Sequence, residues 1–407
     1  MNEDYYFLPI TTIAPAAASA IHGFAHELVS HGSGARVILD ALAADAECGL
    51  GQVYAAALYL TQMTREGQAQ AAPHIAAALS LSPMCSERET DTISAIAAWG
   101  QGDNRGAILM LRRVVEITPQ DLVAAKLCQI LELGAGDVSG MVRTSAMVAA
   151  VEGRSGYALG LHAFALEQAG YPEVALRFAR RALDFNPVCD PWAQHAVAHA
   201  LIAMDQPIEA RAFLRSVAPS WARCSSFMLT HNWWHLALLE LDLGNRGAAF
   251  AIFDEHVWGV RKGHVQDQIN AISLLIRLEM QGACPGWRWN DIATYGENRL
   301  SDRMSDFIDL HYLIALVRSG RNEAASCLCE ALQRERVAGA LAQAIVAHAR
   351  DDFSVAASSI ASVRRKIGEI GGSNVQRDLF EVIFIDCIEQ VRRAPSFVNL
   401  DDYRVAA

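Results

Sequence analysis

The sequence predicts an all-α fold in which antiparallel helix pairs stack into a solenoid that can curl around a central pocket. Three observations predict this fold class. Runs of small and apolar residues recur along the chain, and a short turn with Gly, Asp or Asn breaks each run in two. The second half of a unit often ends at a proline, which cannot continue a helix. An alanine recurs at a fixed distance before that proline, as expected where two helices cross closely.

The two clearest units have the same length and the same internal spacing. AIAAWGQGDNRGAILMLRRVVEITP runs from Ala95 to Pro119, and AFALEQAGYPEVALRFARRALDFNP runs from Ala163 to Pro187, 25 residues in each case. A small residue in the first helix, an alanine in the second and a closing proline are typical of the tetratricopeptide repeat. The sequence therefore predicts a tetratricopeptide-like solenoid.

Further units follow the same alanine marker. The marker alanines of these units are Ala71, Ala210, Ala248, Ala324 and Ala356. The pattern weakens around GACPGWRWND, which is typical of a loop. We therefore expect an N-terminal segment at 1–40, a first repeat block at 41–255, an irregular insertion or junction at 256–300, a second repeat block at 301–395 and a tail at 396–407.

Composition excludes several classes of protein. The net charge of −11 argues against a nucleic-acid-binding surface. No apolar stretch is long enough to cross a membrane, and the acidic start MNEDYYFLPI differs from a signal peptide. The nine cysteines are scattered, without zinc-ribbon spacing. We expect a cytoplasmic protein with reduced thiols and no membrane or nucleic-acid partner; a homo-oligomer is compatible with the sequence.

Two pairs of histidines are the most unusual feature. His195 and His199 in HAVAH, and His231 and His235 in HNWWH, are each four residues apart. Residues at this spacing share one helix face, so each pair can converge on one ligand. His162, His235 and His311 also precede the small packing position of their helices, and equivalent positions stack along a solenoid.

Several roles for these histidines stay open. They can ligate a metal, act as acid–base groups, bind a ligand, or hydrogen-bond within the core. HExxH is absent and no carboxylate stands at a convincing ligand offset, so we assign no metal ligand and no cofactor. A tryptophan in HNWWH can flank the groove and stack on a ligand.

Much of the chain resembles one known family. GLHAFALEQAGYPEVALRFARRALDFNP, HAVAHAL, HNWWHLALLELDLGN, FIDLHYLIALVRSGR and GGSNVQRDLF closely resemble the tetratricopeptide repeat protein 38 family, over roughly residues 40 to 390. The resemblance implies a soluble all-α repeat fold and no established general activity, so it supplies no catalytic residues. GGSNVQRDLF also fits a capping box between Ser373 and Gln376.

The candidate site combines the histidines with the matching polar positions. The predicted catalytic residues are His199, His235 and His162. The predicted binding residues are His195, His231, Trp234, Asp309, His311, Gln376, Arg377 and Asp378. We expect a helical-repeat protein that binds a small molecule or peptide in its concave groove. The alternative is an enzyme that uses the pocket histidines as acid–base groups or metal ligands, for example in a cofactor-free step of bacterial aromatic-heterocycle biosynthesis.

Overall fold

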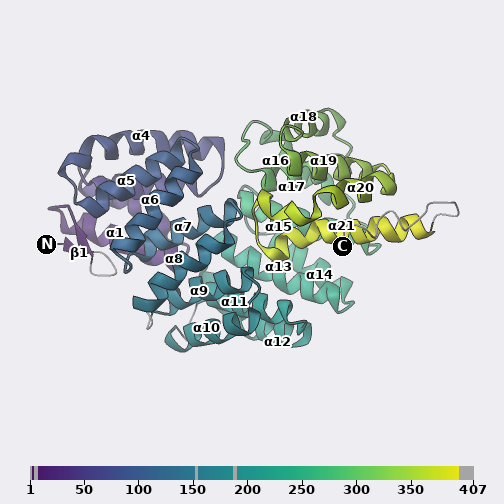
Figure 1. Ribbon diagram of the computed structural model, residues 1–407, viewed down its shortest axis with the longest axis horizontal. Helices are drawn as coiled ribbons and strands as arrows, with labels where there is room; N and C mark the ends of the chain where they lie inside the picture. Colours follow the sequence, from purple (N-terminus) through teal and green to yellow (C-terminus); the bar gives the residue numbers. More distant parts are fainter. Residues whose placement is uncertain (1, 4–7, 152–154, 187–189, 394–407) are drawn as a thin grey trace. The chain divides into compact units, whose positions relative to one another are not determined.

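The computed structural model describes residues 2–3, 8–151, 155–186 and 190–393, and it divides into two compact units, 1–243 and 244–407 (Figure 1). The chain folds as an all-α, tetratricopeptide-like stack of helix pairs, which confirms the predicted fold class. Apart from a two-residue ladder between β1 (Asn2–Glu3) and β2 (Pro9–Ile10), the regular structure of the described residues is helical. Pro187 and the predicted tail lie outside the described residues.

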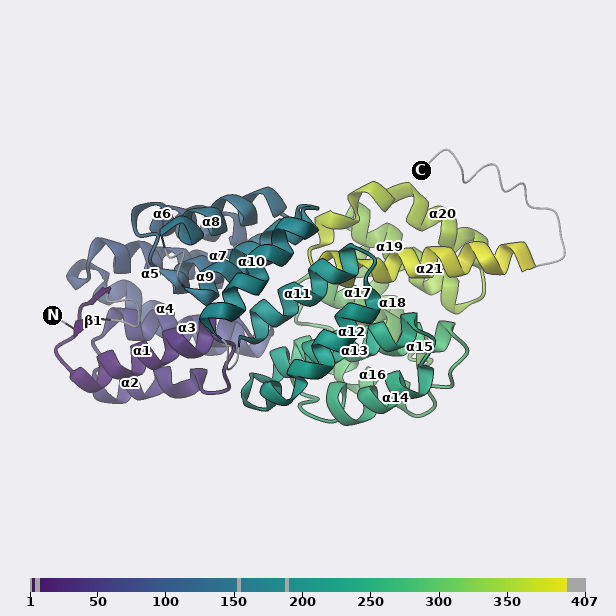
Figure 2. The same cartoon turned by 90° about the horizontal axis from the view of Figure 1, so that it is seen from below.

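Unit 1 contains antiparallel helix pairs that follow one another from purple to teal in Figures 1 and 2. Its α-helices are α1 (Pro15–Val29), α2 (Ile38–Ala44), α3 (Gly49–Leu60), α4 (Arg65–Leu81), α5 (Glu87–Gly100), α6 (Asn104–Ile117), α7 (Leu122–Gly134), α8 (Val138–Val151), α9 (Gly156–Gln168), α10 (Pro172–Phe185), α11 (Pro191–Ala203), α12 (Pro207–Val217) and α13 (Ser226–Asp242). Short 3-10 helices are η1 (Ala35–Val37), η2 (Ser82–Met84) and η3 (Ala218–Arg223).

Local sequence explains where these helices begin and cross. The side chains of Asp103, Asp121 and Asp190 accept a backbone N–H of the helix that follows, which satisfies an N-terminal donor. The turn glycine Gly170 has φ 83°, a left-handed conformation that disfavours other residues. The marker alanine Ala175 is completely buried at its helix crossing, as its repeat position predicts. Close crossing of paired helices therefore depends on this small side chain.

The N-terminal helix α1 packs mainly against α2, and it also contacts α3 and α7, the first helices of two later pairs. The chain after α1 then reaches the start of α13, where the Ser225 N–H donates to the carbonyl oxygen of His31 at 2.7 Å. A bridge between Gly32 and Cys224 lies beside this hydrogen bond. The N-terminal segment therefore covers part of the layer that the first helices of the pairs form in unit 1.

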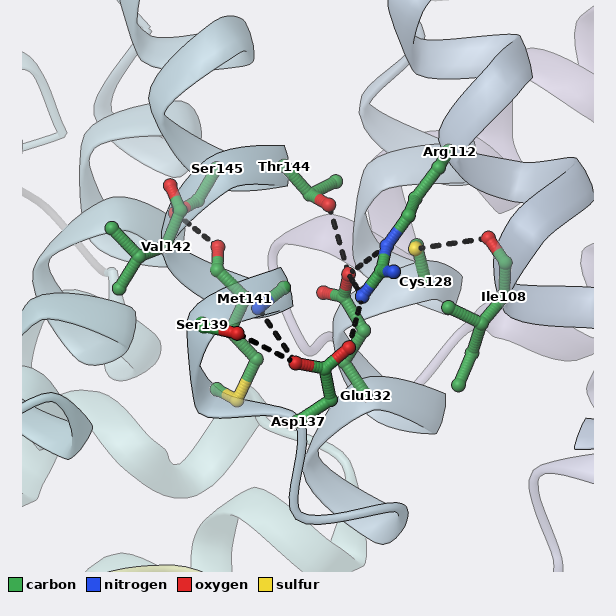
Figure 3. A network of polar contacts seen from close by, with 11 residues as sticks. Ile108, Arg112, Cys128, Glu132, Asp137, Ser139, Met141, Val142, Thr144 and Ser145 are labelled. Carbon is green, nitrogen blue, oxygen red and sulfur yellow. Dashed lines mark hydrogen bonds and ion pairs between the residues drawn. The ribbon is translucent and has the colours of Figure 1, made fainter. Parts of the chain in front are cut away.

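A partly buried ion-pair network joins α6, α7 and α8 (Figure 3). The Arg112 guanidinium donates to Glu132 at 2.8 Å and also binds Asp137. The Thr144 hydroxyl donates to the same Glu132 carboxylate at 2.9 Å, and Glu132 is completely buried. One arginine therefore ties a second helix of one pair to both helices of the next.

Unit 2 continues the same helix-pair design and is described by itself. Its elements are α14 (Arg246–Ile252), the π-helix η4 (Phe253–Val257), α15 (Val265–Met280), α16 (Arg288–Asn298), α17 (Asp306–Arg318), α18 (Asn322–Leu332), α19 (Arg336–Ala349), α20 (Phe353–Val363), η5 (Arg364–Ile370) and α21 (Asn374–Arg393). The stretch 256–300, expected to be irregular, contains α15 and α16. In the described ranges, no helix combines the length and apolar character that a membrane span requires.

Candidate functional site

Four imidazoles meet between α11 and α13 in unit 1. His195 and His199 lie one turn apart on α11, and His231 and His235 lie one turn apart on α13. All four side chains are buried, with 3% or less of each residue exposed. One ring nitrogen from each histidine lies within 4.8 Å of the others. The structure therefore brings both predicted pairs together in one four-histidine cluster, His195, His199, His231 and His235.

The shortest contacts in the four-histidine cluster join nitrogen to nitrogen. His231 Nε2 lies 3.1 Å from His195 Nε2 and 3.3 Å from His235 Nε2. A ring nitrogen has a single in-plane direction for either a proton or a lone pair, so one Nε2 cannot make two well-directed hydrogen bonds. His231 Nε2 therefore lies at hydrogen-bond distance from two ring nitrogens but can direct a hydrogen bond to only one of them.

A carboxylate from a third helix contacts the four-histidine cluster. Glu167 on α9 places its Oε2 3.1 Å from His199 Nδ1, and both residues are buried. The contact fixes the tautomer of His199, since Nδ1–H donates to the carboxylate and Nε2 keeps its lone pair. Among the described residues His199 Nε2 has no hydrogen-bond partner. The sequence pattern gives no sign of Glu167, because this residue precedes its histidine by 32 positions.

Aromatic side chains surround the four-histidine cluster. Trp192 stacks on His195 with ring centroids 4.8 Å apart, and Phe164 contacts both histidines of α11. Trp234 stacks on His231 at 5.2 Å and is completely buried. Trp234 is thus a wall of the cluster and offers no exposed stacking face. This apolar wall keeps the imidazoles out of bulk water.

Burial determines the charge of His195. It lowers the pKa of His195 well below the usual value, because a buried imidazolium loses its hydration, and the neighbouring histidines lower the pKa further. His195 is therefore neutral at physiological pH, the form in which imidazole binds metals.

His162, a predicted catalytic residue, lies elsewhere. Its Nδ1 is 3.0 Å from the Ser145 hydroxyl on α8, and its ring packs edge-on against Phe178 of α10. Phe164, two residues further on, faces the four-histidine cluster. Side chains two positions apart point to nearly opposite sides of a helix. His162 and His235 therefore occupy equivalent repeat positions, but their rings contact different residues.

The remaining predicted residues lie in unit 2. Asp309 on α17 binds Arg303 at 3.0 Å, and burial raises its pKa to about 6. Asp378 on α21 lies 3.8 Å from the buried Arg277 of α15. Gln376 and Ser373 exchange the two hydrogen bonds of a capping box, at 2.9 and 3.3 Å, as the local interpretation of GGSNVQRDLF predicts.

Arg377 also has a structural role at the start of α21. Its guanidinium donates to the Gly372 carbonyl oxygen and to Asn374 Oδ1, the latter at 2.7 Å. These contacts stabilise the turn that precedes the helix. The binding role predicted for Arg377 therefore stays a prediction.

His311 gives a prediction about pH. It is buried on α17, its Nδ1–H donates to the Phe307 carbonyl oxygen at 2.7 Å, and burial lowers its pKa to about 4. The unfolded chain takes up this proton first, near pH 6.5, so His311 reduces stability as pH falls from about 6.5 to about 4. Relative to His311→Gln, the wild type should lose about 3 kcal/mol of unfolding free energy across that range. Urea unfolding of both proteins at several pH values measures this difference.

The control for this prediction is His22→Gln, which changes an exposed histidine of α1. Because this side chain is exposed, its replacement tests whether removal of any histidine changes the pH slope. An equal pH slope for the wild type and His311→Gln would contradict the prediction.

Comparison with known proteins concerns the fold. No family model matches the chain. Among solved structures, the chain is similar to TTC0263, a thermophilic TPR protein of Thermus thermophilus, at 18% identity over 46% of this chain and 99% of that one, with a TM-score of 0.38. It is similar to the APC/C hetero-tetramer Cut9–Hcn1 at 11% identity over 92% and 69%, with a TM-score of 0.47. It is also similar to the human IFIT1 dimer with m7Gppp-AAAA at 14% identity over 91% and 86%, with a TM-score of 0.45.

Proposed function

We propose that this chain is a metal-binding helical-repeat protein in which the four-histidine cluster holds one transition-metal ion. Zinc fits this donor set best, because it accepts four imidazole nitrogens in tetrahedral geometry. The observation that carries the proposal is the convergence of Nε2 atoms at 3.1 and 3.3 Å. Zinc–nitrogen bonds of about 2.0–2.1 Å place neighbouring ligands of a tetrahedron about 3.3 Å apart.

The surroundings of the four-histidine cluster support a metal rather than acid–base catalysis. An acid–base group must reach a substrate proton, whereas these nitrogens face one another in a buried space. Glu167 accepts a hydrogen bond from His199 Nδ1, the arrangement that orients and strengthens a metal-ligating imidazole. Near the histidines in the sequence, no carboxylate stands at a ligand offset. Glu167 approaches instead from the preceding helix pair.

The chain's own residues give the site two properties. Because two ligands come from α11 and two from α13, ligation fixes the position of one helix pair on the next. Because the four rings are buried, water reaches the site poorly, and a closed set of four protein ligands is typical of structural zinc. A zinc ion supplies positive charge and, if one ligand is displaced, a Lewis-acid position.

Metal analysis tests the proposal. Protein prepared without chelators should contain about one zinc, or another transition metal, per chain, measured by elemental analysis. Protein stripped with a chelator should regain about one equivalent on dialysis against zinc. A stripped protein that takes up no stoichiometric metal at neutral pH would overturn the proposal.

A small-molecule ligand fits this site better than a peptide. The four histidines are buried, and the rings of Trp192 and Trp234 stack on two of them. Buried side chains can enclose a small molecule, whereas an extended peptide needs an open groove. Binding of a small molecule near the four-histidine cluster is therefore part of the proposal, as is the relation to the tetratricopeptide repeat protein 38 family. The cytoplasmic location stays a prediction.

A further inference from the structure

Lys126, on α7 in unit 1, is a buried amine without a close counter-ion. Only 2% of the residue is exposed, and its Nζ lies 3.6 Å from the centre of the Trp192 ring. In the described part of the chain no Asp or Glu oxygen reaches ion-pair distance of this Nζ; Asp190 acts on it from further away. The chain has two other lysines, and both are paired: Lys262 with Asp291 at 2.6 Å and Lys366 with Glu369 at 3.6 Å.

The charge of Asp190 is compensated elsewhere. Its Oδ1 accepts the Ala193 N–H at 2.9 Å at the start of α11, and its Oδ2 accepts from the Asn186 amide at 2.9 Å. The helix dipole also favours a negative charge at this position. Contact with the Trp192 ring stabilises the Lys126 ammonium only in part. Burial accordingly lowers the pKa of Lys126 to about 7, which is the consequence of a charge without a near partner.

Two further polar atoms beside Lys126 lack partners. The Trp192 Nε1–H is buried without an acceptor among the described residues, and so is His31 Nε2. His31 stacks on Trp192 at 5.0 Å, and the charge of Lys126 contributes to the lowered pKa of His31. His31 has φ 55°, an uncommon conformation for a residue other than glycine. Buried polar atoms in folded proteins nearly always have a partner, so these two atoms, next to a Lys126 ammonium with no ion-pair partner among the described residues, indicate a missing ligand.

We infer that Lys126, Trp192 and His31 form a binding site for a small carboxylate, beside the four-histidine cluster. The ammonium and the indole N–H are both donors, and an anionic acceptor satisfies the two together. His31 Nε2 donates or accepts according to its tautomer. The rings of Trp192, His31 and Phe227 lie next to one another and favour a flat apolar body behind the carboxylate. This site deepens the proposed small-molecule binding and does not depend on the metal.

The small number of lysines makes a direct experiment available. Full-length chain labelled with [15N]lysine gives three backbone amide signals, which Lys→Met variants assign one at a time. Sodium benzoate should shift the Lys126 signal saturably and leave those of Lys262 and Lys366 unchanged. Benzamide has the same ring without the charge and should cause no saturable shift. Chelator-treated protein should respond in the same way, which separates this outcome from the metal proposal.

Variants test which groups hold the carboxylate. Lys126→Met should weaken benzoate binding at least about tenfold, because a charge-assisted hydrogen bond is lost. Lys262→Met, in a partly buried ion pair with Asp291 in unit 2, should leave binding unchanged. Trp192→Phe keeps an aromatic ring but removes the N–H, and should weaken binding about threefold to tenfold even if Lys126→Met fails to fold. An unshifted Lys126 signal, or equal shifts with benzamide, would show that water satisfies these polar atoms and would refute the inference.

Discussion

Replacement of His231 by alanine should abolish tight metal binding. His231 Nε2 is the nitrogen that contacts both His195 and His235, so its loss removes the central donor of the four-histidine cluster. Zinc binding to four protein ligands is worth about 10–16 kcal/mol, which gives about 3–4 kcal/mol per ligand. The dissociation constant should therefore rise about 100-fold to 1000-fold, as measured by competition with a chelator of known affinity.

Thermal unfolding gives an independent measurement of the same effect. A metal that binds only the folded state stabilises it, by about 4 kcal/mol when its concentration is 1000 times the dissociation constant. Zinc should therefore raise the midpoint temperature of the wild type but not that of His231→Ala. The effect of zinc on Glu167→Gln should lie between its effects on the wild type and on His231→Ala. Its zinc affinity should fall about 10-fold to 100-fold, because the substitution weakens the hydrogen bond that orients the ligand His199.

His162→Ala is the matched control for His231→Ala. Both substitutions remove a buried histidine of unit 1, but His162 contacts Ser145 and Phe178 instead of the four-histidine cluster. His162→Ala should lose stability and keep wild-type metal affinity. If both variants bind zinc as the wild type does, or if zinc fails to stabilise the wild type, the cluster is a packed polar core and the metal proposal is wrong.

The fold was predictable because its signals are local. The marker alanine Ala175 and the turn glycine Gly170 act within one helix pair, and the same packing problem recurs in each pair. This pattern stays recognisable even where individual residues of the repeat consensus are replaced. The contacts of α1 with α3 and α7 were not predictable in this way, since packing of one helix against later pairs leaves no periodic signal.

The sequence predicted only those site residues that lie together on one face of a helix. The spacing of His195 with His199 places both rings on one face, and the same holds for His231 with His235. Glu167, Lys126 and His31 come from three other elements, and no spacing relates them to the histidines. Composition does single out Lys126, since lysine is rare in this chain and a lone lysine within an apolar helix is unusual.

Arg112→Met should destabilise unit 1 by about 3 kcal/mol or more, since it leaves the buried Glu132 carboxylate without its cation. Glu132 is completely buried, and burial already raises its pKa although Arg112 and Thr144 oppose that shift (Figure 3). Without Arg112 the carboxylate retains the Thr144 hydroxyl at 2.9 Å and the weak thiol donor Cys128, neither of which is charged. Urea unfolding followed by circular dichroism measures the loss. Arg180→Met, which breaks an exposed pair with Glu209, should cost less than about 1 kcal/mol.

The double variant Arg112→Met with Glu132→Met separates burial of an unpaired charge from loss of packing. If the unpaired carboxylate causes the destabilisation, removing it should restore most of the lost free energy, because two apolar side chains can replace a buried ion pair at little cost. The single variant should also recover as pH falls. Its Glu132 pKa rises further in the folded state, so folding takes up a proton and becomes less favourable as pH increases. A penalty that is independent of pH and persists in the double variant would instead assign the role of Arg112 to packing of its aliphatic stem.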